Sequence, residues 1–200
     1  MSTASLQTRP RGLVLADAIP GARVRDAALV LGGALLVALF AQIQFPVPGS
    51  PVPISGQTLA VVVVGASLGA RRGAASLALY ALLGLVLPFY SDGGSGLDVI
   101  WGATGGYIVG FVLAAYLVGR AAELGADRKP VLAVATFALA QLAVFVIGVP
   151  WLMVAANLDL AAGIAAGFTP FVVGGIVKAV IAGLVTPSAW SLVRKLDRKG

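Results

Sequence analysis

The sequence of 200 residues contains no cysteine and no histidine. Without thiols the chain has no disulfides or thiolate nucleophiles, and without imidazoles it lacks the commonest general base and the usual zinc ligands. Charge is also scarce: Asp, Glu, Lys and Arg make up 11% of the chain, against about a quarter in an average soluble domain. These absences exclude an ordinary soluble domain, and we expect no enzymatic activity, no metal site and no cofactor.

Apolar residues are in excess, at 59% of the sequence, and the mean hydropathy is +0.98. A helix needs about 20 residues to cross about 30 Å of hydrocarbon, so the chain has no room for a sizeable domain outside the lipid bilayer. The pattern predicts an all-α integral membrane protein with six transmembrane helices. The six apolar stretches are approximately 27–45, 59–70, 73–87, 104–122, 131–149 and 171–193.

Basic residues fall on alternate connections between these stretches. The other connections, 46–58, 88–103 and 150–170, contain no Lys or Arg. Because Lys and Arg in short loops mark the cytoplasmic side, both termini are predicted to be cytoplasmic. A basic face spread over four membrane junctions forms no groove for a phosphate backbone, so we expect no nucleic-acid partner. Thirteen of the 14 basic residues follow this partition: Arg9, Arg11, Arg23, Arg25, Arg71, Arg72, Arg120, Arg128, Lys129, Arg194, Lys195, Arg198 and Lys199.

The beginning of the chain is polar and is interrupted by Pro10 and Pro20. Its short apolar patch does not reach the length of a signal-peptide core. We therefore predict a cytoplasmic N-terminal tail over residues 1–25, a six-helix membrane domain over 26–194 and a basic cytoplasmic tail over 195–200.

The second and third apolar stretches are short for membrane spans. The segment 45–53 before them is apolar but holds four prolines, which prevents a helix. Irregular backbone at membrane depth persists only where protein or a water-filled cavity surrounds it. The segment therefore predicts an outward-facing ligand cavity, capped by this Pro-rich loop and by the Gly-rich loop 92–96. The alternative is a surface loop beside helices that begin earlier.

The fourteenth basic residue, Lys178, lies about 12 Å inside the sixth stretch. An ammonium group at such a position costs about 2.5–3.5 kcal/mol on insertion scales and usually faces a partner or a cavity. Gly174 and Gly175 share its helical face and leave room for a ligand. We predict that Lys178 binds a carboxylate or a polarised carbonyl oxygen. The alternatives are a structural pair with Asp98 or Asp159, or extension of the side chain to the membrane interface.

Other polar and aromatic side chains fall in the same outward half of the predicted bundle. A few fixed polar groups among apolar and aromatic walls are typical of a small-molecule pocket. The candidates for this pocket are Gln57, Thr58, Trp101, Thr104, Tyr107 and Trp151.

The chain also lacks the G-x-x-x-x-G-K-[ST] loop of nucleotide triphosphatases, and no stretch contains a pair of carboxylates for proton coupling. If the protein moves a solute uphill, another protein must supply the energy. The first stretch offers a surface for such a partner, because the pairs Ala28 with Gly32 and Ala34 with Ala38 have the small-xxx-small spacing that permits close helix approach.

Several motifs occur in order from about residue 26 to residue 180, and together they resemble those of the BioY family. BioY proteins are the biotin-binding S components of energy-coupling-factor (ECF) vitamin transporters. The motifs are Gln42-Ile43, Pro46-x-Pro48-Gly49-Ser50-Pro51-Val52-Pro53, Gln57-Thr58-Leu59-Ala60-Val61, Gly102-Ala103-Thr104-Gly105-Gly106-Tyr107, Trp151-Leu152 and Pro170-Phe171-x2-Gly174-Gly175-x2-Lys178.

The resemblance implies a six-helix S component in the plasma membrane of a prokaryote that captures biotin from outside. It also implies a membrane T subunit and paired cytoplasmic ATPase subunits as partners, with the small residues of the first helix at the contact. The residues that the resemblance and the cavity argument assign to the biotin site are Lys178, Tyr107, Thr104, Gln57, Trp101, Gly174 and Gly175.

Two positions depart from the family pattern. Gly175 stands where the family usually has an aspartate, so Lys178 lacks a carboxylate one turn away, and Ala103 replaces a common proline. Either another acceptor serves the ureido group of biotin, or the ligand is held less tightly, or its chemistry differs. The alternative function is therefore an S component for another small vitamin or a biotin precursor.

A more distant alternative makes Lys178 the Schiff-base lysine of a retinal-type chromoprotein. The predicted six spans, where a retinal-type chromoprotein has seven, and the low aromatic content of 8% disfavour this alternative.

Overall fold

The computed structural model describes residues 14–18 and 23–197. Most of the predicted N-terminal tail and the last residues of the C-terminal tail lie outside the described residues. The helices are α1 (Arg23–Ala41), α2 (Gln57–Leu68), α3 (Ala70–Leu83), α4 (Leu97–Trp101), α5 (Gly105–Glu123), α6 (Pro130–Ala155), α7 (Leu160–Gly167) and α8 (Phe171–Asp197), with 3-10 turns at Leu15–Ala18, Ser91–Gly93 and Ala126–Arg128.

Each of the six predicted apolar stretches forms a helix, namely α1, α2, α3, α5, α6 and α8. Four of them are long and apolar enough to cross a membrane: Val24–Ala41, Gly105–Glu123, Pro130–Ala155 and Phe171–Ser191. The helices α2 and α3 have 12 and 14 residues, as their short apolar stretches predict. The helical membrane fold is therefore confirmed, with four full-length helices and two shorter ones packed among them.

The predicted connection 150–170 differs in the structure. It begins inside α6, because this helix continues through Pro150 to Ala155. A proline interrupts one backbone hydrogen bond, but a helix in a membrane tolerates it when neighbouring groups satisfy the freed carbonyl. The rest of that connection contains the short helix α7, whose first turn is capped by the side chain of Asp159.

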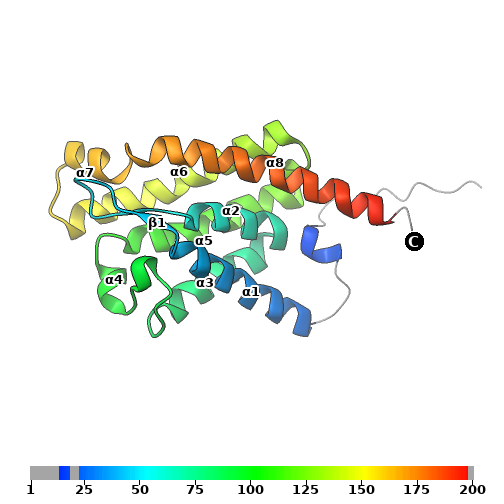
Figure 1. Ribbon diagram of the computed structural model, residues 1–200, viewed down its shortest axis with the longest axis horizontal. Helices are drawn as coiled ribbons and strands as arrows, with labels where there is room; N and C mark the ends of the chain where they lie inside the picture. Colours follow the sequence, from blue (N-terminus) through cyan, green and yellow to red (C-terminus); the bar gives the residue numbers. More distant parts are fainter. Residues whose placement is uncertain (1–13, 19–22, 198–200) are drawn as a thin grey trace, which may run out of the picture.

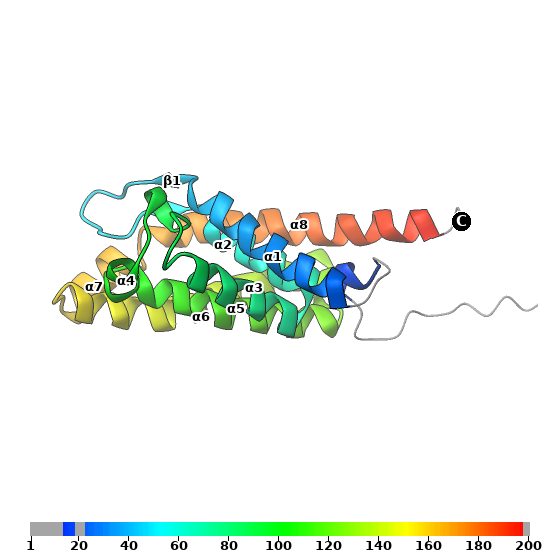
Figure 2. The ribbon, with the colours of Figure 1, turned by 90° about the horizontal axis from the view of Figure 1, so that it is seen from below.

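The bundle is elongated, with α5, α6 and α8 running along its length and α1 crossing the shorter helices (Figures 1 and 2). The helix α5 is the centre of the fold: it packs against α6 on one side and against α2 and α3 on the other. Small residues permit this close packing. A Cβ added at Gly119 would lie 2.3 Å from the backbone nitrogen of Ala70, so the backbones of α5 and α3 touch there.

The Pro-rich segment forms a short β-hairpin, which the sequence does not predict. The strands β1 (Gln44–Phe45) and β2 (Ile54–Ser55) are antiparallel, with Gln44 opposite Ser55. The four prolines lie in the loop between the strands, where they interrupt no ladder of hydrogen bonds. The hairpin lies at the same end of the bundle as α4 and α7 (Figure 1).

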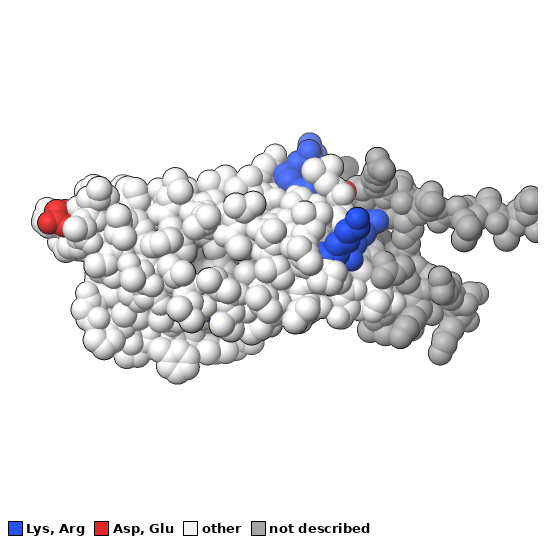
Figure 3. Space-filling model, turned by 90° about the horizontal axis from the view of Figure 1, so that it is seen from above, with Lys and Arg blue, Asp and Glu red and all other residues white. Residues whose placement is uncertain are grey.

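Charge is separated along the long axis. On the face shown in Figure 3, the Lys and Arg side chains gather towards the end that leads to the chain termini, and acidic side chains mark the opposite tip. At the basic end, four arginines from three helices share one surface cleft with Asp26 and Glu123; they are Arg25, Arg71, Arg72 and Arg120. Arg9, Arg11, Arg198 and Lys199 lie outside the described residues; the described arginines of this cleft gather at one end of the folded bundle, as the partition predicts.

The small residues of α1 do not form one exposed surface. Ala28 and Gly32 are exposed, but Ala34 and Ala38 are buried against the rest of the bundle, with exposed fractions of 0% and 6%. The two pairs are six positions apart, so they point in directions about 120° apart around the helix. The prediction that Ala34 and Ala38 contact a partner is therefore wrong for this structure, because both side chains pack inside the chain.

Candidate functional site

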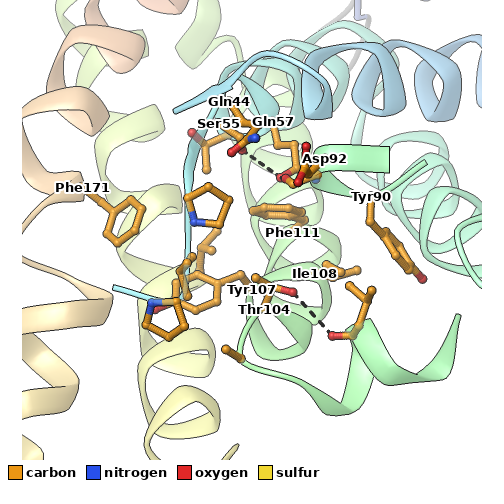
Figure 4. A pocket seen from close by; sticks show the side chains of 18 of the residues that line it. Gln44, Ser55, Gln57, Tyr90, Asp92, Thr104, Tyr107, Ile108, Phe111 and Phe171 are labelled. Carbon is orange, nitrogen blue, oxygen red and sulfur yellow. Dashed lines mark hydrogen bonds between the residues drawn. The ribbon is translucent and has the colours of Figure 1, made fainter. Parts of the chain in front are cut away.

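A cavity of about 400 Å³ lies between the hairpin, the loop before α4 and the helices α5, α6 and α8. This volume is within the range of small-molecule sites. Figure 4 shows its wall, with Gln44 and Ser55 from the hairpin on one side, and Tyr107 and Phe111 from α5 with Thr104 just before that helix on another. The cavity is therefore bounded by the Pro-rich and Gly-rich segments, as the irregular backbone predicts.

Aromatic and aliphatic side chains make the larger part of the wall. Thr104, just before α5, and Tyr107, Ile108 and Phe111 on it have the spacing of one helical face, and all four line the cavity. The Tyr107 ring lies edge-on to Phe145 of α6, with 6.3 Å between ring centroids. Its hydroxyl donates a hydrogen bond to the Gly167 carbonyl, so the ring itself, with its hydroxyl engaged, forms the wall.

Lys178 enters the cavity from α8 and is partly buried. Its ammonium donates to the carbonyl oxygen of Ser55 at 2.5 Å and to the hydroxyl of Thr58 at 3.1 Å. The predicted alternative of a pair with Asp98 or Asp159 is not what the structure shows, since a backbone carbonyl and a hydroxyl take that place. An ammonium group has three donors, so one remains for an oxygen of a bound molecule.

Gln57, at the start of α2, holds three segments around the cavity together. Its amide oxygen accepts hydrogen bonds from the hydroxyls of Ser55 at 2.8 Å and Ser91 at 3.1 Å, and its amide nitrogen donates to the hydroxyl of Tyr80. The side chain is buried, so these bonds replace those that water would supply. Gln57 therefore fixes the hairpin and the loop before α4 relative to each other.

The Gly-rich loop is held by a second glutamine outside the cavity wall. Gln42 donates to the carbonyl oxygen of Tyr90 at 3.1 Å and accepts from the backbone nitrogen of Gly93 at 3.1 Å. Between them, Asp92 has a left-handed backbone with φ of 60°. This conformation brings Ser91 and Asp92 to the edge of the cavity (Figure 4).

The structure brings most of the predicted site residues together. Lys178, Tyr107, Thr104, Gln57 and Gly175 line the cavity, and so does Thr58.

Trp101 and Gly174 are not among the residues that line it. Trp101 is 69% exposed and stacks on Trp151, with 5.7 Å between ring centroids, while the Trp151 nitrogen donates to the Gly102 carbonyl. Trp151 is likewise not among the residues that line the cavity, so the two tryptophans contact each other outside its wall.

Sequence reasoning missed several wall residues. Gln141 is a polar side chain in the middle of an apolar span, which is the signal that identifies Lys178. Phe171 lies seven positions before Lys178, and therefore on the same face of α8. Phe111 follows Tyr107 by one helical turn, and this spacing could also have found it. Ser91, Asp92 and Phe145 depend on the path of the loops and on helix packing, which no local pattern records.

A bundle of apolar helices of membrane-spanning length, arranged around a small-molecule cavity that holds one lysine, defines a multi-pass membrane protein with a ligand site. The particular family follows from comparison with known proteins. The family model described as "BioY family" matches residues 10–195, and the chain belongs to this family. This assignment leaves the retinal-type chromoprotein without support.

Curated relatives agree with the family assignment. The chain is 33% identical over 170 residues to "Biotin transporter BioY2" of Lactococcus lactis, which covers 84% of this chain and 90% of that protein. It is 34% identical over 140 residues to "Biotin transporter BioY" of Thermotoga maritima, covering 70% and 81% of the two chains.

A solved structure described as the S-component for biotin from an ECF-type ABC transporter is similar in fold. Its TM-score is 0.75 at 22% identity, and the match covers 89% of this chain and 93% of that chain. The helical arrangement is therefore that of an S component.

Proposed function

We propose that this protein captures biotin at the outer face of the membrane as the S component of an ECF-type transporter. The observation that carries the proposal is the cavity: one intramembrane ammonium, a few hydrogen-bonding groups, the carboxylates of Asp92 and Asp98 and an aromatic wall, in a chain of the BioY family. As a member of a transporter family it is not an enzyme, and the groups that line the cavity are suited to binding.

The chemistry of biotin suits these groups. Biotin has a carboxylate, a ureido ring with one carbonyl oxygen and two N–H donors, and an apolar sulfur-containing ring. The remaining donor of Lys178 can pair with a carboxylate or ureido oxygen. The rings of Tyr107, Phe111 and Phe145 offer apolar surface to the bicyclic part. Ligand contact by Lys178, Tyr107, Thr104, Gln57 and Gly175 is part of this proposal.

The energy for uptake comes from partner subunits in this proposal. The chain has no phosphate-binding loop, so a membrane T subunit and cytoplasmic ATPase subunits would drive the cycle. Ala28 and Gly32, which are exposed on α1, are the small residues available for helix contact. The basic end would face the cytoplasm, with both termini there and the hairpin outside.

Titration of the purified protein with biotin tests the proposal. Isothermal calorimetry in detergent or nanodiscs should show saturable binding of one biotin per chain. Desthiobiotin, lipoate, thiamine and riboflavin serve as competitors. Absence of saturable biotin binding at micromolar concentrations would contradict the proposal. Preference for one of the competitors would favour the alternative that Gly175 motivates, an S component for another small vitamin or a biotin precursor.

A further inference from the structure

The side-chain amide of Gln141 packs against Gly175 in the cavity wall. This residue lies on α6, its side chain is 5% exposed, and it faces Gly175 on α8. Its amide nitrogen donates to the Gly175 carbonyl oxygen at 2.9 Å. A Cβ added at Gly175 would lie 2.7 Å from Oε1 of Gln141, closer than two such atoms approach in proteins. The amide therefore fills the space that any side chain at position 175 would occupy.

The direction of this amide is fixed by its partner. A carbonyl oxygen only accepts hydrogen bonds, so the nitrogen of the Gln141 amide must face Gly175. The oxygen Oε1 is then left as an acceptor at the cavity wall, and within the described residues no protein group donates to it. Gly175 is one turn from Lys178 on the same face of α8, so this acceptor belongs to the part of the wall from which the lysine projects.

We propose that Oε1 of Gln141 is the acceptor for a ligand N–H group, and that Gly175 is required because it leaves room for this amide. The proposal rests on the proposed function, in which the ligand is biotin and the donor is one of its ureido N–H groups. An acceptor on α6 thus takes the role for which the sequence offers no carboxylate beside Lys178. Because the amide is neutral, it leaves the charge of Lys178 for an oxygen of the ligand.

A ligand lacking the donor is discriminated because, once bound, it would cover Oε1 of this buried side chain and leave the oxygen without a partner. This predicts that Gln141 determines specificity. Its removal should weaken ligands that have the N–H group and leave ligands without it nearly unaffected.

The first experiment changes both sides of the proposed hydrogen bond. Gln141→Met keeps a similar length and volume but removes the acceptor. We expect it to bind biotin about tenfold more weakly than the wild type, by calorimetry. The ligand side of the hydrogen bond is changed by methylating each ureido nitrogen of biotin in turn. For the nitrogen that donates to Gln141, methylation should weaken wild-type binding but add little to the loss in Gln141→Met. A merely structural role would weaken biotin and both methylated ligands in parallel.

The second experiment uses two neighbouring glycines. In Gly175→Ala the new Cβ meets Oε1, which is the end of a flexible side chain, so the protein should fold while the amide is displaced. Biotin binding should again weaken about tenfold. Gly174→Ala is the matched control, because a Cβ there meets nothing within 4 Å, and it should bind like the wild type.

The outcomes separate the two proposals. If the wild type does not bind biotin, the proposed function fails. If the wild type binds biotin while Gln141→Met and Gly175→Ala bind it equally well, the inference about Gln141 is overturned and the proposed function stands.

Discussion

The interface of α5 with α2 and α3 and the loops around the cavity are held together by different kinds of contact. At the interface, backbones touch through small residues: a Cβ on Gly65 would lie 2.7 Å from the Ala115 carbonyl, and one on Gly119 would lie 2.3 Å from the Ala70 nitrogen. Around the cavity, side chains bridge separate segments through hydrogen bonds, as Gln57 and Gln42 do.

The difference follows from the solvent of each region. Lipid gives helices no hydrophobic reason to associate, so close packing of small residues must hold them together. An open cavity cannot be close-packed, and its irregular loops must satisfy their backbone groups by other means. The protein therefore combines a packed half, in which α5 meets α2 and α3, with a cavity end whose loops depend on a few polar side chains.

The largest effect is expected at the packed half. Gly119→Leu would force α5 away from α3, because the new side chain meets backbone atoms that cannot move aside. We expect a loss of stability of about 3 kcal/mol, or about 10 °C in apparent Tm, by thermal unfolding in detergent. Gly32→Leu is the control, since a Cβ at Gly32 meets nothing within 4 Å and this variant should unfold like the wild type. Equal stability of the two variants would show that the α5–α3 contact is not as close as described.

The second-largest effect is expected at the cavity. Lys178→Ala removes the ammonium that we propose contacts biotin, and affinity should fall about 100-fold, the usual range for loss of a charged hydrogen bond. Stability should change less than in Gly119→Leu, because the variant loses two hydrogen bonds at the cavity wall without forcing any backbone apart. Calorimetric titration beside a thermal scan measures both quantities. Unchanged affinity would remove Lys178 from the site.

The smallest effect concerns Asp127 in the connection between α5 and α6. Its carboxylate accepts a hydrogen bond from the Trp190 nitrogen at 2.5 Å, while among the described residues its second oxygen has no partner. Burial raises the pKa of this carboxyl, against the opposing effects of Trp190 and Arg128. A raised pKa means that the folded state favours the protonated form, so stability falls as the pH rises from the ordinary carboxyl pKa through the raised one.

Asp127→Asn keeps an acceptor for Trp190 but cannot ionise. At pH 7 we expect it to be more stable than the wild type by about 1 kcal/mol, with the difference disappearing below the ordinary carboxyl pKa. Apparent Tm measured from pH 3.5 to 8 tests this. A gap that stays constant across this range would exclude titration of Asp127 as its cause.

Much of the fold follows from the sequence because two of its signals are strong. Apolar stretches mark the helices, and the alternation of basic connections corresponds to the basic end of the bundle. The four prolines between residues 45 and 53 likewise predict irregular backbone at the cavity.

The sequence does not predict which face of each helix packs inside the bundle. In a membrane both faces are apolar, so hydropathy does not tell which small residues pack inside. This is why Ala34 and Ala38 were assigned to a partner although they are buried. The sequence also does not show whether Trp101 and Trp151 line the cavity, because a ring near the end of a helix can turn either way.

The site is predictable where a polar group stands inside an apolar span, as Lys178 does. Gln141 carries the same signal in weaker form, because it is uncharged. Its meaning depends on Gly175 across the helix interface, and only the packing of α6 against α8 brings these two positions together.

The two bonds that the Lys178 amine makes to Ser55 and Thr58 give the site a further property. The nitrogen that would receive a solute also holds β2 at Ser55, which lines the cavity. A solute that takes the bond to Ser55 would loosen β2, and a change at β2 would then alter the affinity for solute by an equal free energy. Occupancy of the proposed site and the position of β2 would thus be thermodynamically linked through a single atom.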